Sequence, residues 1–177
     1  MDLQFPIGPF QWTGEASEEQ LRRFADELAE TPMRLRTAVL GLSEGQLDTP
    51  YRPGGWTVRQ VVHHLPDSHL NGYTRFRLGL TEDLPTIKPY DQARWAELPD
   101  ARTAPVALSL TLLESLHARW VMLLRSMTAL DFARTIQHPE LGVLKLDRYA
   151  ALYAWHGRHH VAHITSLRDR LGWKTPK

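Results

Sequence analysis

Apolar residues recur every three to four positions in four separate stretches of the chain, and this spacing predicts amphipathic helices. The first helix is expected to begin at Ser17, where Gln20 completes a capping box, and to run to about Leu42. Pro32 lies inside this stretch, and it is expected to kink or restart the helix because proline lacks the backbone N–H.

The second helix is expected from Thr57, where Gln60 completes another capping box, to about Leu80, with a bend at Pro66. A loop over residues 81–104 separates it from a third helix, predicted from about Pro105 to Met127. A loop of this length is usually functional or mobile. The predicted apolar stripe of the third helix consists of Leu108, Leu112, Leu116, Trp120, Leu123 and Leu124.

The fourth helix is expected to open at Asp147 as its N-cap and to end at Gly172, a residue suited to the left-handed position after a helix. A short hairpin-like turn over residues 141–146 is expected before it, and residues 43–55 form a connecting loop. Because no useful period-2 strand pattern competes, the fold class is predicted to be all-α, a four-helix bundle with long crossover loops.

Length and composition narrow the class of protein. The chain has 177 residues, which suits a single domain over residues 1–177 with an irregular N-terminal arm at residues 1–16. With 21 Lys and Arg against 20 Asp and Glu, the formal charge is +1, and the charges are interspersed. This balance argues against a nucleic-acid-binding protein, which would carry a basic face.

The chain contains no cysteine, which excludes a disulfide scaffold, a thiolate-ligated zinc site and a catalytic thiol of its own. No stretch approaches the roughly 20 apolar residues of a membrane span, and the N-terminus lacks the pattern of a signal peptide. A cytoplasmic protein with no membrane or nucleic-acid partner is therefore expected.

Histidine is the outlier in the composition, with nine copies, of which three lie within residues 63–69 and four within residues 156–163. A single buried histidine is most often a hydrogen-bonded core residue. A cluster of buried imidazoles is different, because each ring needs a polar partner and one metal ion satisfies several at once. The clusters therefore favour a metal site over a purely structural role.

The histidines of the fourth helix lie on its core-facing side. At 100° per residue, His156 and His160 are about 40° apart, on the stripe that also carries Tyr149. This i, i+4 spacing suits two ligands of one divalent ion. His163 lies on the same stripe and His159 at its edge, so the pair His159 and His163 offers a rival register with the same spacing.

Other candidate site residues lie outside these clusters. The loop over residues 81–104 carries Tyr90, Asp91 and Trp95, which we expect near the mouth of the metal site as part of a substrate pocket; a surface loop packed by its own Trp95 is the alternative. Asp67 and Asp91 are candidate general bases. His117 and His138 are each expected to be solvated or capped.

The clearest resemblance to a known family lies in the run from Leu47 to Leu65, LDTPYRPGGWTVRQVVHHL. This run resembles the signature of the DinB-like superfamily, and more closely of its YfiT branch. The resemblance continues through Phe5-Pro6-Ile7-Gly8, Asp67-Ser68-His69, Lys88-Pro89-Tyr90-Asp91, Leu116-His117-Ala118-Arg119-Trp120, Trp155-His156 and His163-Ile164-Thr165.

The resemblance implies a four-helix bundle, usually a homodimer, with one divalent metal ion per chain held by three histidines. Carried over to this sequence, the ligands are His64, His156 and His160. Zinc is the expected metal, and nickel also suits an all-nitrogen site. In this register His163 is expected to be hydrogen-bonded to a ligand or to accept a proton during catalysis, and His159 is expected to face an adjacent helix or solvent.

The resemblance also implies activity. Members of the family resemble enzymes that join a low-molecular-weight thiol such as bacillithiol to an electrophilic small molecule. A metal ion lowers the pKa of a bound thiol, and in a chain without cysteine the sulfur must come from a cosubstrate. A metal-dependent hydrolase that activates water is the alternative. A metal-binding dimeric bundle without turnover is the third reading.

Overall fold

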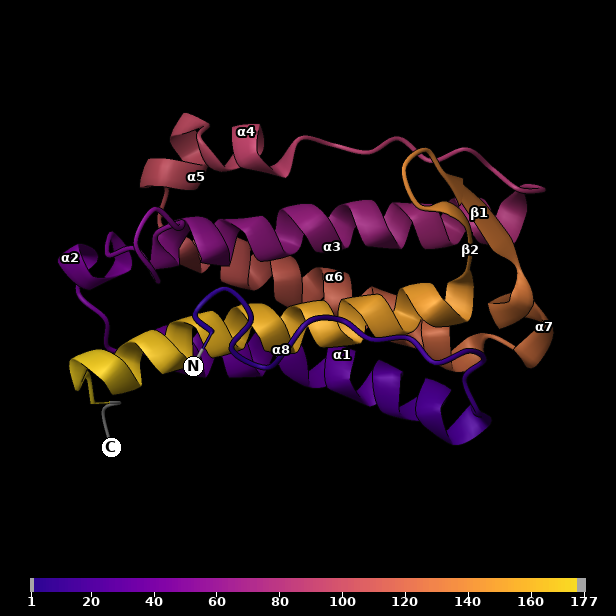
Figure 1. The fold of residues 1–177 in the computed structure, drawn as a ribbon, viewed down its shortest axis with the longest axis horizontal. Coiled ribbons are helices and arrows are strands. Elements are labelled where there is room, and N and C mark those ends of the chain that lie inside the picture. The colour runs from indigo at the N-terminus through magenta and orange to yellow at the C-terminus, as the bar shows by residue number, and fades with distance from the viewer. Residues whose placement is uncertain (1, 175–177) are drawn as a thin grey trace.

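The computed structural model describes residues 2–174; residue 1 and residues 175–177, at the ends of the expected domain, lie outside the described part. Within it, the helices longer than twenty residues are α1 (Glu18–Val39), α3 (Val58–Thr81), α6 (Val106–Ser126) and α8 (Leu146–Leu171). They lie along the long axis of the molecule (Figure 1). The predicted four-helix bundle is confirmed.

The four helices form a closed ring of neighbours, in which α1 and α3 each pack against both α6 and α8. The segment between α3 and α6 returns along the whole bundle, so α6 starts at the same end as α3 and runs in the same direction (Figure 1). The arm before α1 follows α8, where the carbonyl of Gly8 accepts a hydrogen bond from Trp155 Nε1 at 3.2 Å.

The predicted starts of the first two long helices are confirmed. Ser17 caps α1 and Thr57 caps α3, and each forms the expected capping box with the glutamine three residues later. Pro32 and Pro66 both lie inside continuous helices. The predicted restart of the first helix at Pro32 is therefore wrong, because packing against α6 and α8 keeps α1 continuous through the proline.

Short helices lie in the segments between the long helices, where the apolar pattern predicts no helix. They are α2 (Glu44–Leu47), α4 (Gln92–Ala96), α5 (Pro99–Thr103) and α7 (Ala129–Ala133). Helices of four or five residues are too short to show a helical period, so the sequence pattern could not separate them from loops. Side-chain caps mark three of them, at Ser43, Asp91 and Thr128.

The expected hairpin is present, but it is longer than predicted. Strands β1 (Thr135–His138) and β2 (Gly142–Lys145) pair antiparallel, with Ile136 opposite Leu144. Helix α8 follows directly with Lys145 as its N-cap, so the prediction of Asp147 as N-cap is wrong. The predicted end is confirmed, since Gly172 adopts the left-handed conformation with a φ of 66°.

The predicted stripe of α6 is wrong at its start. Leu108 and Leu112 are exposed, whereas Leu110 and Leu113 are buried. Of the helices in the described residues, α6 alone is long and apolar enough to cross a membrane by length and composition. This helix packs against α1 and α3, and its Trp120 is fully buried in the bundle.

The core of the bundle consists of two apolar clusters along its axis. One surrounds Phe76 and Trp120, and the other surrounds Leu65 and Ile164. Between them, polar side chains from all four long helices form a layer, namely Thr31, His69, His117, His156 and His160. The histidines therefore lie in mid-bundle, where an imidazole without a polar partner would be costly.

Candidate metal centre

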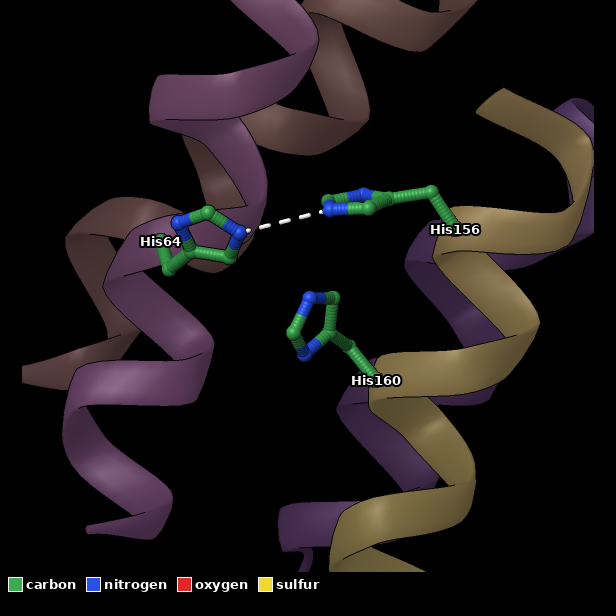
Figure 2. A group of neighbouring side chains, drawn as sticks. All are labelled: His64, His156 and His160. Atoms are coloured by element: carbon green, nitrogen blue, oxygen red, sulfur yellow. Dashed lines mark hydrogen bonds between the residues drawn. The ribbon is translucent and has the colours of Figure 1, made fainter. Parts of the chain in front are cut away.

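Three histidines from two helices converge, two of them from this layer and the third, His64, from the neighbouring turns of α3 (Figure 2). His64 comes from the second turn of α3, and His156 and His160 come from successive turns of α8. The Nε2 atoms of His64 and His156 lie 3.3 Å apart. The possible ligand atoms of all three residues lie within 4.8 Å of one another.

This arrangement fits a divalent ion with imidazole ligands. Two nitrogens bound at 2.0–2.1 Å to a tetrahedral zinc ion lie about 3.3 Å apart, the separation found between His64 and His156. The donor set is nitrogen only, which suits zinc or nickel and disfavours calcium or magnesium. Three protein ligands leave a fourth position open, as in catalytic zinc sites.

The electrostatics of the site keep these imidazoles neutral, the state that can bind a metal. Burial, followed by the neighbouring His159 and His163, lowers the pKa of His64 to about 3. Burial is also the main reason that the pKa values of His156 and His160 lie well below the ordinary value.

A cavity of about 430 Å³ opens beside the α8 histidines. Helix α8 forms one wall with Trp155, His156, His159, His160 and His163. The remaining lining side chains come from the N-terminal arm, the loop before α3 and the start of α4, namely Gln4, Phe5, Tyr51, Arg52, Trp56 and Gln92. Arg52 is the one fully charged residue among the described residues of this lining, which contains no carboxylate.

Aromatic rings fix the histidines at the edge of this cavity. The ring of Trp56 lies 4.7 Å from that of His64. Tyr51 stacks on His163 at 4.0 Å, and the guanidinium of Arg52 lies 5.5 Å from the Tyr51 ring. The loop before α3 therefore covers the histidines with apolar surface and places a positive charge at the entrance.

The rival set of ligands is also close in space. Possible ligand atoms of His159, His160 and His163 lie within 4.8 Å of one another. Both nitrogens of His163 already have partners, because Nδ1 lies 3.3 Å from His160 Nδ1 and Nε2 lies 3.0 Å from the Gln4 carbonyl. His163 thus contacts a predicted ligand directly.

His159 differs from its predicted placement. It was expected to face a neighbouring helix or solvent, but it is buried under the N-terminal arm, stacked on Trp155 at 4.4 Å and 5.7 Å from the Phe5 ring. Its Nδ1 has no hydrogen-bond partner among the described residues. Burial, and then His163, lowers the pKa of His159 to about 4.

The other predicted site residues lie outside the cavity wall. Asp67 is one turn beyond His64, and burial raises its pKa to about 6. Tyr90 and Trp95 pack on each other with ring centres 4.6 Å apart, and Asp91 caps α4. The structure brings Gln92 of this segment, rather than these three residues, to the cavity.

Sequence reasoning missed two further histidines. His69 is fully buried, and its two nitrogens lie 3.1 Å from His156 Nδ1 and 2.8 Å from His117 Nε2. His117 is 1% exposed, so its prediction as solvated or capped is wrong. A signal was present, because His117 falls between Leu113 and Trp120 on the buried side of α6.

Fold and site together define a protein class, the four-helix bundles that can hold a metal ion through histidines of facing helices. The chain belongs to the DinB superfamily, whose family model matches residues 27–164.

Several relatives match over almost the full length. A protein of Bacillus mycoides named "putative metal-dependent hydrolase" is 55% identical over 97% of this chain and 99% of its own. A Bacillus cereus protein with the same name is 56% identical over the same shares. The structure of YfiT from Bacillus subtilis matches with a TM-score of 0.96 and 48% identity, over 98% of this chain and 100% of that one. YfiT is described as "a probable metal-dependent hydrolase with an unusual four-helix bundle topology".

Proposed function

We propose that this protein is a metal-dependent enzyme that transfers a small anionic thiol, of the bacillithiol type, to an electrophilic carbon. The observation that carries the proposal is the composition of the cavity, in which four imidazoles, two of them predicted metal ligands, meet one arginine and no carboxylate. An anionic cosubstrate suits such a lining, and a thiol must come from outside because the chain has no cysteine.

His64, His156 and His160 would hold the metal ion in this proposal. When bound, a divalent ion lowers the pKa of a thiol or a water molecule that shares its site. Arg52 would pair with a carboxylate of the cosubstrate at the cavity entrance.

His159, another residue of the cavity, can account for the removal of the thiol proton before the carbon–sulfur bond forms. His159 lines the cavity and is neutral at pH 7, since burial lowers its pKa to about 4, so it can accept the thiol proton. The sulfur then forms a bond with the electrophilic carbon, and the leaving group departs with the bonding electron pair. With a haloaromatic electrophile, the products are a thioether, a halide ion and a proton, which His159 passes on to solvent because its pKa is lowered to about 4.

Hydrolysis is the second candidate, favoured by the names of the Bacillus relatives. It would use the same three histidines. The lining of the cavity offers no carboxylate as a general base for water, so His159 would serve there as well.

The deciding experiment incubates the zinc-loaded protein with several small thiols and a haloaromatic electrophile, and separately with esters and amides in the absence of thiol. Thioether formation supports transfer, provided that Arg52 acts as proposed. In Arg52→Ala the KM for an anionic thiol should rise, whereas the KM for a neutral thiol should stay the same. Ester or amide cleavage without thiol supports hydrolysis instead. Absence of both, with zinc bound, contradicts both. We also propose a homodimer, to be checked by sedimentation equilibrium.

A further inference from the structure

A chain of hydrogen bonds leads from the bundle core to the predicted ligand His156. The Leu28 carbonyl of α1 lies 2.6 Å from His117 Nδ1. His117 Nε2 lies 2.8 Å from His69 Nδ1, and His69 Nε2 lies 3.1 Å from His156 Nδ1. Four helices thus contribute one link each, from α1 through α6 and α3 to α8.

The direction of every bond in this chain follows from counting protons. A neutral imidazole has one N–H and one lone pair, whereas a backbone carbonyl can only accept. His117 must therefore donate from Nδ1 to Leu28 and accept at Nε2. His69 then donates from Nδ1 to His117 and accepts at Nε2, which makes His156 donate from Nδ1.

The result at His156 is a lone pair on Nε2, the atom that faces His64. A shorter chain has the same result at His160. The Gln4 carbonyl accepts from His163 Nε2, which leaves a lone pair on His163 Nδ1 for the N–H of His160 Nδ1. The remaining lone pair of His160 is then also on Nε2.

We propose that the Leu28 and Gln4 carbonyls, acting through these histidines, fix the tautomers of His156 and His160, and that His69 and His117 are positioning residues for the metal ion. Both ligands of α8 are then prepared to bind through Nε2 before any metal arrives. The two series of hydrogen bonds also favour His156 and His160 over His159 and His163 as the ligand pair, because the Nδ1 of His160 is occupied by its bond with His163.

Burial supports neutral rings throughout the longer chain. His69 and His117 are 0% and 1% exposed, and a charged imidazole in this buried layer would be costly. Reversing the chain would turn a lone pair of His117 toward the Leu28 carbonyl inside a buried layer, and this unpaired contact would be costly.

The first test needs no variant. Long-range ¹H–¹⁵N spectra of the metal-free protein, labelled at histidine, report which ring nitrogen carries the proton. We expect protonated Nδ1 in His69, His117, His156 and His160, and protonated Nε2 in His163. Protonated Nε2 in His156 would overturn the proposal.

The second test measures zinc affinity in folded variants by competition with a chelator. His69→Leu removes the acceptor for His156 and should weaken zinc binding by roughly 10- to 100-fold. His69→Gln keeps an acceptor in its side-chain oxygen and should bind zinc more tightly than His69→Leu. The zinc affinity of His117→Leu should lie between the affinities of His69→Leu and His69→Gln. His138→Leu, which alters a histidine of the hairpin, is the matched control and should leave the affinity unchanged.

Equal zinc affinity in wild type, His69→Leu and His69→Gln would overturn the positioning role, and so would equal losses in His69→Leu and His138→Leu. Circular dichroism confirms that each variant is folded. The inference rests on the metal site but on neither reaction class. Tautomers and zinc affinity are read without turnover, so an inactive protein with the expected tautomers would contradict the proposed function alone.

Discussion

His63 and His64 are consecutive residues of α3, yet their rings have different neighbours. His64 Nε2 lies 3.3 Å from His156 Nε2, within the metal centre. His63 Nδ1 lies 2.7 Å from Ser109 Oγ of α6, and its Nε2 lies 3.1 Å from the Ala104 carbonyl. The rotation of 100° per residue separates a predicted ligand from a residue that joins two helices.

Substitution of these two neighbours should have opposite effects. His64→Ala removes one of three predicted ligands and should weaken zinc binding by roughly 100-fold or more. His63→Ala should keep zinc affinity but lower the free energy of unfolding by about 1–3 kcal/mol, because it breaks buried hydrogen bonds. Chelator competition and thermal unfolding measure the two quantities. Zinc loss in His63→Ala alone would contradict the assignment.

The two registers of α8 can be separated by alanine variants. His160→Ala should lose zinc in either register, because His160 belongs to both groups. His156→Ala should lose zinc as well, whereas His159→Ala should retain it and lose turnover. Metal content by elemental analysis and the rate under saturating zinc are the measurements. Retained zinc in His156→Ala with loss in His159→Ala would establish the rival set.

Asp67 should make stability depend on pH. Burial, and then the charge of Asp100, raises the Asp67 pKa from 3.8 to about 6. The folded state therefore binds more protons than the unfolded state between these values, and this contribution to stability falls as pH rises from about 4 to about 6. The side chain of Asn does not titrate, so Asp67→Asn should lack this pH-dependent contribution to stability.

The gain in the free energy of unfolding of Asp67→Asn over wild type should be absent near pH 3, grow across that window and stay constant above it. Because Asp67 is only half-buried and solvent screens its charge, we expect this gain to be about 1–2 kcal/mol. Denaturant unfolding at several pH values measures it. Asp100→Asn is the control, and it should lower the Asp67 pKa without abolishing the shift. A constant advantage at every pH would contradict the prediction.

Gly157 permits the close approach of α8 to α1. A Cβ atom at this position would lie 2.7 Å from Thr31 Oγ1 and 2.8 Å from its Cγ2. Gly157→Ala should therefore destabilise the fold by about 1–3 kcal/mol, despite the better helix propensity of alanine. Thr31→Ala removes both contacted atoms, so the double variant should recover most of the loss. Additive effects in this double-mutant cycle would argue against the contact.

The sequence by itself determined the four long helices of this protein. The spacing of its apolar residues located four long helices, and Ser17, Thr57 and Gly172 marked helix ends correctly. These features are local, because a capping side chain bonds within its own first turn and a helical stripe shows in one stretch of chain. The same periodicity placed His156 and His160 on the inner side of α8, and the resemblance supplied His64 as their partner.

Only the tertiary structure decided what the remaining polar residues do. The helical period can place His117 on the buried side of α6, but it cannot reveal the partners of His69 and His117, which are a carbonyl and rings from other helices. Likewise, Gln4 and Arg52 reach the cavity through an irregular arm and a loop that have no period to read. Hydrogen bonds between residues far apart in the chain depend on how helices pack, and a burial pattern records only that a side chain is inside.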